Sequence, residues 1–131
     1  MTLNRLQPEG LPRPEMYSQV VVATGGRTVY VAGQVSVDAA GLVVAPGDFA
    51  GQAQQAYRNL GLALEAAGAT PADVTKLTTY VVGYSPLLLP DLGAARRALF
   101  GDSLPASTLV GVAHLARPEL LIEVEAIAVV G

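Results

Sequence analysis

Apolar residues recur along the chain with two periods, every second residue in some segments and every third or fourth in others. The two-residue period and β-branched residues predict strands over residues 19–23, 28–35, 76–84, 106–113 and 120–130. The longer period predicts a helix over 49–67 and a second from Pro90 or Asp91 to 100–101. The order is ββαβαββ, which predicts an α+β fold with a mixed sheet and both helices on one face.

Turn and capping residues mark the ends of these elements. Gly-Gly within residues 24–27 predicts a hairpin between the first two strands, because glycine accepts the positive φ of tight turns. Asp48 suits an N-cap and Gly68 a C-cap of the first helix. Thr-Pro-Ala-Asp at 70–73 predicts a short helical turn. The proline-rich residues 1–16 are expected to lie extended against the surface.

The first two predicted strands are apolar on both faces, whereas two helices can cover only one face of a sheet. The other face would then be a large exposed apolar patch, which soluble monomers rarely carry. Self-association is the simplest remedy.

A length of 131 residues predicts a single domain over 1–131. Hydrophobic residues make up 51% and the mean hydropathy is +0.42, a surplus that we assign to a subunit interface. No apolar run approaches the roughly 20 residues that span a bilayer, and the N-terminus lacks a signal-peptide core. We therefore expect a cytoplasmic protein that does not engage a membrane.

The charge and the side-chain inventory exclude several classes of function. The net charge is −3, the basic residues are scattered, and the chain has two Phe and no Trp. Nucleic-acid binders normally carry a basic stripe with stacking aromatics, so we expect no nucleic-acid partner. With one histidine and no cysteine, we also expect no metal site and no cofactor.

Two carboxylates interrupt the last apolar segment. In a strand over 121–129, Glu123 and Glu125 lie on the same face. A carboxylate on an apolar surface is unfavourable unless it is bonded or neutralised. These two therefore face water, have dedicated partners, or carry a raised pKa suited to proton transfer.

The segment that contains them resembles the C-terminal signature of the Rid family, also called YjgF or RidA and, in older usage, endoribonuclease L-PSP. The matching stretches are Pro-Ala-Ser-Thr-Leu-Val at 105–110 and Ile-Glu-Val-Glu-Ala-Ile-Ala at 122–128, with upstream likeness at 31–35, 52–68 and 73–81. The resemblance covers nearly the whole chain. It implies a chorismate-mutase-like homotrimer with a central barrel, whose clefts between adjacent subunits hold a small-molecule ligand.

The resemblance also implies roles for individual residues. Glu123 matches the position credited with activating the hydrolytic water; the alternative is a structural carboxylate held by backbone N–H groups. Tyr17 falls near the entry to the cleft, where its hydroxyl could hold a ligand or the residue could simply fill the subunit seam. Gly33 matches a position whose backbone lines the cleft, and a β-bulge without ligand is the alternative. Glu125 is expected to be structural or interfacial.

The departure from the family is at Ser107. Family members with imine deaminase activity carry an arginine there, which grips the substrate carboxylate in a way that a hydroxyl cannot copy. Leu109 matches a position whose backbone N–H donates to that carboxylate, so a weakened anion site could persist. A dyad of Ser107 with His114 is disfavoured, because seven residues along a strand place the two side chains on opposite faces.

Other arginines could supply the missing charge. Arg13 lies four residues before Tyr17 and Arg117 lies in the turn after His114, although a solvated surface position is the favoured alternative for both. Arg96 and Arg97 are expected on the exposed face of the second helix, near its C-terminal end.

These observations favour a hydrolase that converts a reactive enamine or imine to a carbonyl compound and ammonia, with a substrate other than a simple 2-imino acid. The alternative is a non-catalytic trimer that binds a small metabolite or a protein partner in the same cleft. Endoribonuclease activity follows only from the older family name, and the acidic charge balance counts against it.

Overall fold

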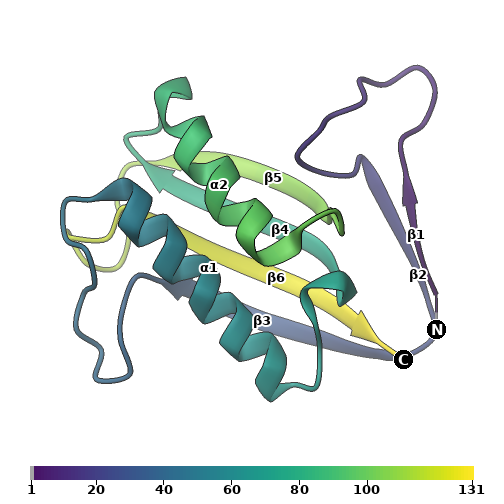
Figure 1. The fold of residues 1–131 in the computed structure, drawn as a ribbon, viewed down its shortest axis with the longest axis horizontal. Coiled ribbons are helices and arrows are strands. Elements are labelled where there is room, and N and C mark those ends of the chain that lie inside the picture. The colour runs from purple at the N-terminus through teal and green to yellow at the C-terminus, as the bar shows by residue number, and fades with distance from the viewer. Residues whose placement is uncertain (1) are drawn as a thin grey trace.

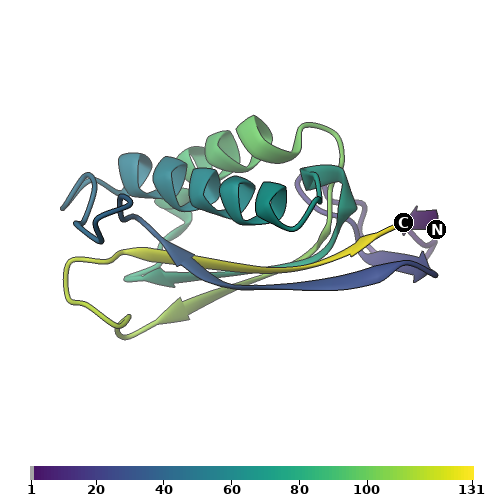
Figure 2. The same ribbon diagram turned by 90° about the horizontal axis from the view of Figure 1, so that it is seen from below.

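The computed structural model describes residues 2–131, and Met1, the first residue of the segment predicted to be extended, lies outside them. A four-stranded sheet has the order β3-β6-β4-β5, in which only β4 and β5 are parallel. Both α-helices lie on one face, and Figure 2 shows the opposite face free of helices. The elements are β1 Thr2–Leu6, β2 Val20–Thr24, β3 Arg27–Val35, α1 Phe49–Ala66, η1 Pro71–Asp73, β4 Val74–Val82, η2 Pro86–Leu88, α2 Leu89–Phe100, β5 Ala106–Val112 and β6 Ile122–Val130.

The α+β class, the mixed sheet and the placement of both helices on one face are confirmed. Asp48 caps α1 as predicted, since its Oδ1 accepts a hydrogen bond from the backbone N–H of Gly51 at 3.1 Å. The helical turn predicted over 70–73 is also present, with a capping box between Thr70 and Asp73. Within residues 2–131, no helix combines the length and the apolar character needed to cross a membrane.

The hairpin predicted around residues 24–27 is wrong. β2 pairs with β1, from Thr2 opposite Thr24 to Leu6 opposite Val20, and β3 pairs with β6. Gly25 and Gly26 do adopt positive φ values of 74° and 80°, yet the chain leaves the turn in a new direction. Figure 1 shows β1 and β2 as a separate arm beside the end of the main sheet. The extra strand β1 supplies the backbone partners that β3 would have given to β2.

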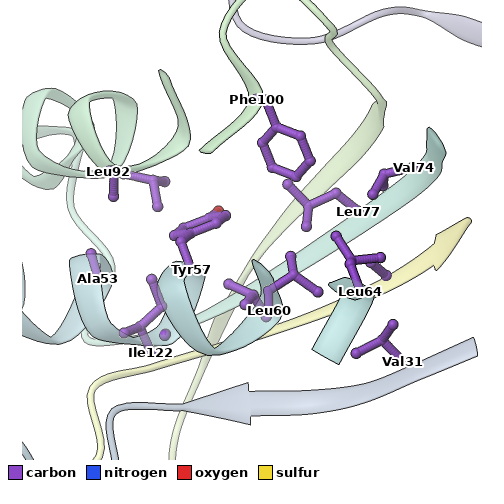
Figure 3. Close-up of a cluster of buried hydrophobic side chains, with 14 of the residues drawn as sticks. Val31, Ala53, Tyr57, Leu60, Leu64, Val74, Leu77, Leu92, Phe100 and Ile122 are labelled. Atoms are coloured by element: carbon purple, nitrogen blue, oxygen red, sulfur yellow. The ribbon is translucent and has the colours of Figure 1, made fainter. Parts of the chain in front are cut away.

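The core lies between the helices and the sheet. Tyr57, Leu60 and Leu64 of α1 are buried against Leu77 of β4 and Ile122 of β6 (Figure 3). Alternate residues of β6 point into this core, so the residues between them lie on the face that no helix covers.

The prediction for Arg96 is also wrong. Its side chain is only 7% exposed, whereas its neighbour Arg97 is exposed. The Arg96 guanidinium turns towards the sheet because two hydroxyls beneath α2 accept its hydrogen bonds, those of Tyr57 and Thr79.

Candidate functional site

The two carboxylates of β6 lie on the uncovered face of the sheet. The residues that flank them, Ile122, Val124 and Ala126, are buried in the core on the other face. Glu123 pairs with Val35 of β3 on one side and Tyr80 of β4 on the other. Glu125 pairs with Thr78 one step along the sheet.

Glu125 has a dedicated partner in Tyr80. The phenolic hydroxyl of Tyr80 donates a short hydrogen bond to Glu125 Oε1. This bond is the largest cause of a raised pKa at Tyr80, followed by desolvation and by the negative charges of Glu125 and Glu123. Tyr80 therefore stays protonated as a donor at neutral pH, and Glu125 serves as its acceptor.

Glu123 differs, because its carboxylate has no hydrogen-bond donor among residues 2–131. Every buried side-chain nitrogen and oxygen in that part of the chain has a partner, so the Glu123 oxygens are not sealed from solvent. They lie over Gly33, where an added Cβ would stand only 2.0 Å from Glu123 Oε2. The register of β3 against β6 shifts between Val31 and Gln34, so Gly33 combines a bulge with the close approach of a carboxylate.

Tyr17, Ser107 and Leu109 lie at the opposite edge of the sheet. Next to Tyr17, the backbone N–H of Ser18 donates to Pro105 O at 3.0 Å, and the Ser18 hydroxyl donates to Leu104 O at 2.6 Å. These bonds hold the Tyr17 segment against the start of β5. Leu109 packs on the core, so the half-buried Ser107, two residues earlier, also faces the helices.

One chain thus groups the predicted residues into two sets instead of one. Glu123 and Gly33 are together on the uncovered face. Val110 is the residue of β5 that lies level with Glu123 across the sheet. Ser107 lies three residues before Val110, a distance of about 10 Å along the strand. It also lies on the other face, so Glu123 and Ser107 do not share a site within one chain.

The remaining candidates have other roles or positions. Arg117 Nη1 donates to Gly41 O at 2.7 Å, which ties two loops together. Arg13 is exposed, and His114 is exposed in the loop after β5. Among the described residues 2–131, no group of three or more His, Cys, Asp or Glu side chains is placed to hold a metal ion.

Sequence reasoning missed two residues, Tyr80 and Arg96. The alternation of β4 places Tyr80 on one face, but its pairing with Glu125 depends on the register between β4 and β6, which no local pattern specifies. Arg96 looked like a surface residue beside Arg97. The helical spacing from the buried Leu92 to Phe100, with Arg96 midway, was the available signal.

The sequence and the structure both resemble known proteins. The family model for endoribonuclease L-PSP matches residues 11–130. A RutC family protein of Pyrococcus horikoshii is 35% identical over 121 residues, covering 92% of each chain. A 2-iminobutanoate/2-iminopropanoate deaminase of Rattus norvegicus is 37% identical over 118 residues, covering 88% of this chain and 80% of its own.

Two solved structures place this fold among its relatives. A protein of unknown function of the conserved Rid family, YyfB from Yersinia pestis, superposes with a TM-score of 0.94 at 42% identity, covering 99% of this chain and 100% of its own. A putative endoribonuclease from Thermotoga maritima has a TM-score of 0.72 at 34% identity, with 95% and 91% coverage.

Proposed function

The chain belongs to the endoribonuclease L-PSP family, also called YjgF or RidA, and on this premise we propose that it hydrolyses a reactive enamine or imine. The products are a carbonyl compound and ammonia. Relatives that match most of the chain are named 2-iminobutanoate/2-iminopropanoate deaminase, which supports this class of reaction.

The observation that carries the proposal is the difference between the two carboxylates of β6. Glu125 is occupied by the Tyr80 hydroxyl, whereas Glu123 has no donor among residues 2–131 and lies over a glycine. A carboxylate with free oxygens beside an open backbone is suited to bind and orient a water molecule. The alternative role for Glu123 is a structural carboxylate held by backbone N–H groups, and no backbone N–H of residues 2–131 donates to it.

The chemistry needs one water and one proton acceptor. Glu123 takes a proton from the water as its oxygen attacks the imine carbon, and passes that proton to the nitrogen to give a carbinolamine. It then takes the hydroxyl proton of the carbinolamine and delivers it to the nitrogen as the carbon–nitrogen bond breaks, which leaves the carbonyl compound and ammonia. Backbone N–H groups at Gly33 and Leu109 hold the substrate, and Tyr17 closes the cleft. An enamine first tautomerises to the imine, gaining a proton on carbon and losing one from nitrogen, and then follows the same path.

The proposed site is complete only in an assembly. The uncovered face of the sheet carries Tyr30, which is 78% exposed, and one chain holds the candidate residues in two separate sets. We propose a homotrimer in which the β5 edge of one subunit meets the Glu123 face of the next, around a small-molecule ligand. Sedimentation of the protein as a monomer at micromolar concentration would contradict this assembly.

Ser107 determines which substrate fits. A serine hydroxyl cannot replace the two-pronged, charge-assisted grip of an arginine on a carboxylate. The preferred substrate therefore lacks a carboxylate at the position of a simple 2-imino acid, or carries it elsewhere. The same substitution is what favours the second candidate function, a non-catalytic trimer that binds a metabolite or a protein partner in this cleft.

The direct test compares ammonia release by the wild type, Glu123→Gln and Glu125→Gln. Imines without a carboxylate are generated in situ by an amine oxidase, and 2-imino acids by an amino acid oxidase. We expect Glu123→Gln to reduce turnover about a hundredfold or more, the usual contribution of a general base. Glu125→Gln is the matched control, because it keeps an acceptor for Tyr80. Equal turnover by Glu123→Gln and the wild type contradicts the proposal, and no turnover of any imine favours the non-catalytic trimer.

A further inference from the structure

Arg96 is an unusual residue to find beneath a helix. Its side chain is 7% exposed, and its guanidinium donates to two neutral hydroxyls, from Nε to Tyr57 OH at 3.0 Å and from Nη2 to Thr79 Oγ1 at 3.3 Å. The two hydroxyls also bond each other at 2.9 Å. Neutral acceptors orient the guanidinium but do not offset its charge, and a buried charge without a counter-ion is unfavourable.

The third nitrogen of this guanidinium, Nη1, has no acceptor in the described part of the chain and is not sealed from solvent. Within residues 2–131 Nη1 donates no hydrogen bond, yet every buried side-chain nitrogen and oxygen there has a partner. Nη1 is therefore accessible. Arg96 lines a small pocket of about 80 Å³, formed with Glu15, Met16, Arg97, Gly101, Asp102 and Leu104. A water needs only about 10–15 Å³ of such space, so a carboxylate group fits, whereas a bulky ligand does not.

The charged residues that line the pocket differ in their exposure to solvent. Arg96 is buried, while Arg97, Glu15 and Asp102 are exposed at the rim. Solvent screens the rim charges far more than the buried one. The interior of the pocket therefore attracts anions through Arg96, and the rim charges, two of them negative, act mainly at the mouth.

The pocket adjoins the edge of the sheet where the family's arginine is missing. Thr79, which accepts from Arg96 Nη2, is directly opposite Leu109 in the register of β4 and β5. Ser107 lies on the same helix-facing side of β5. On the other wall, Met16 precedes Tyr17 and packs so closely on α2 that its Cε would lie 2.9 Å from a Cβ added to Gly93.

We propose that the Arg96 pocket binds the carboxylate of a small organic anion. In this chain the positive charge for that carboxylate comes from α2 instead of from position 107 of β5. The proposal deepens the proposed function: the hydrolysed imine carries a carboxylate displaced from the position that a 2-imino acid would occupy.

Binding is measured with acetate and 2-oxobutanoate as probes, and with acetamide as the uncharged match for acetate. Backbone amide NMR shifts are followed at Met16, Gly101 and Leu104 in wild type, Arg96→Gln and Arg117→Gln. We expect saturable shifts with both carboxylates and none with acetamide. Arg96→Gln should weaken binding about tenfold or more. Arg117→Gln, which removes an exposed guanidinium that donates to Gly41 O, should leave the affinity unchanged.

Two further variants protect the test against misfolding. Arg96→Lys keeps the charge and should retain part of the binding. Met16→Trp fills the pocket without touching the charge and should abolish binding. Acetate shifts that do not saturate, or that are equal in wild type and in Arg96→Gln with a native spectrum, overturn the proposal. If acetate binds but no imine is hydrolysed, the anion-binding proposal stands and the proposed function is overturned. If an imine is hydrolysed but acetate does not bind, the proposed function stands and the anion-binding proposal is overturned.

Discussion

At the scale of single residues, Glu123 and Glu125 share one face of β6 but not one environment. Their common face could be predicted from alternation alone. Their separate roles could not, because the Tyr80 hydroxyl bonds Glu125 from a strand more than 40 residues away in sequence. The sequence left two alternatives for Gly33, backbone that lines the cleft or a β-bulge without ligand. The structure has a register shift there, and the Glu123 side chain lies against the glycine.

The pairing of Tyr80 with Glu125 predicts a pH effect at high pH. The folded state raises the pKa of Tyr80 above 10.0, first through the Glu125 bond. The folded protein therefore holds this proton more tightly than the unfolded chain. The stability from this pair is complete below pH 10 and is lost as the pH rises through the folded pKa.

The measurement is tyrosinate absorbance during an alkaline titration of the wild type and of Tyr80→Phe. The difference between the two curves is expected to titrate above 10.0. Tyr80→Phe should also show a smaller loss of thermal stability than the wild type between neutral and alkaline pH. A difference curve centred at or below 10.0 contradicts the Tyr80–Glu125 pairing.

At the scale of elements, caps and periodicity predicted both helices closely, because these signals are local. The arm of β1 and β2 was not predicted, because Gly-Gly indicates only that the chain turns. Which strands then pair depends on residues that are distant in sequence. β1 supplied one partner, and the Ser18 bonds to Leu104 and Pro105 anchor the start of the arm. The bulge in β3 could not be settled from the sequence for the same reason, because it is a shift in the register of β3 against β6, a strand that is distant in sequence.

The packing of β3 on β6 makes Gly33 sensitive to substitution. A Cβ at Gly33 would stand 2.0 Å from Glu123 Oε2 and 2.6 Å from its Cδ, so Gly33→Ala must displace the carboxylate or the bulge. We expect a loss of about 1–3 kcal/mol, typical of overpacking, measured by urea unfolding. Gly111→Ala on β5 is the control, because a Cβ added to Gly111 would lie 3.3 Å from its nearest neighbour, the Cβ of Tyr84. Equal stability of the two variants would argue against the close approach.

At the scale of the whole molecule, the sequence predicted a sheet with one uncovered face, and the structure has that face (Figure 2). The burial of Arg96 beneath α2 was not predicted, although its helical spacing from Leu92 and Phe100 indicates it, because an arginine beside Arg97 is ordinarily a surface residue. The two sets of site residues, one around Glu123 and one along β5, are explained if adjacent subunits meet between them. Under the proposed function, the site at that boundary lacks an arginine for the substrate carboxylate because residue 107 is a serine.

The most direct measurement is ammonia release from 2-iminobutanoate, generated in situ by a dehydratase, with the wild type and Ser107→Arg. Losing a charge-assisted pair to a carboxylate costs about 2–5 kcal/mol, so the wild type should be slow with this substrate. Ser107→Arg is predicted to raise the rate at least about tenfold, and a further Glu123→Gln substitution should remove the gain. If neither protein releases ammonia above the spontaneous rate, the assignment of a hydrolytic site at Glu123 is contradicted.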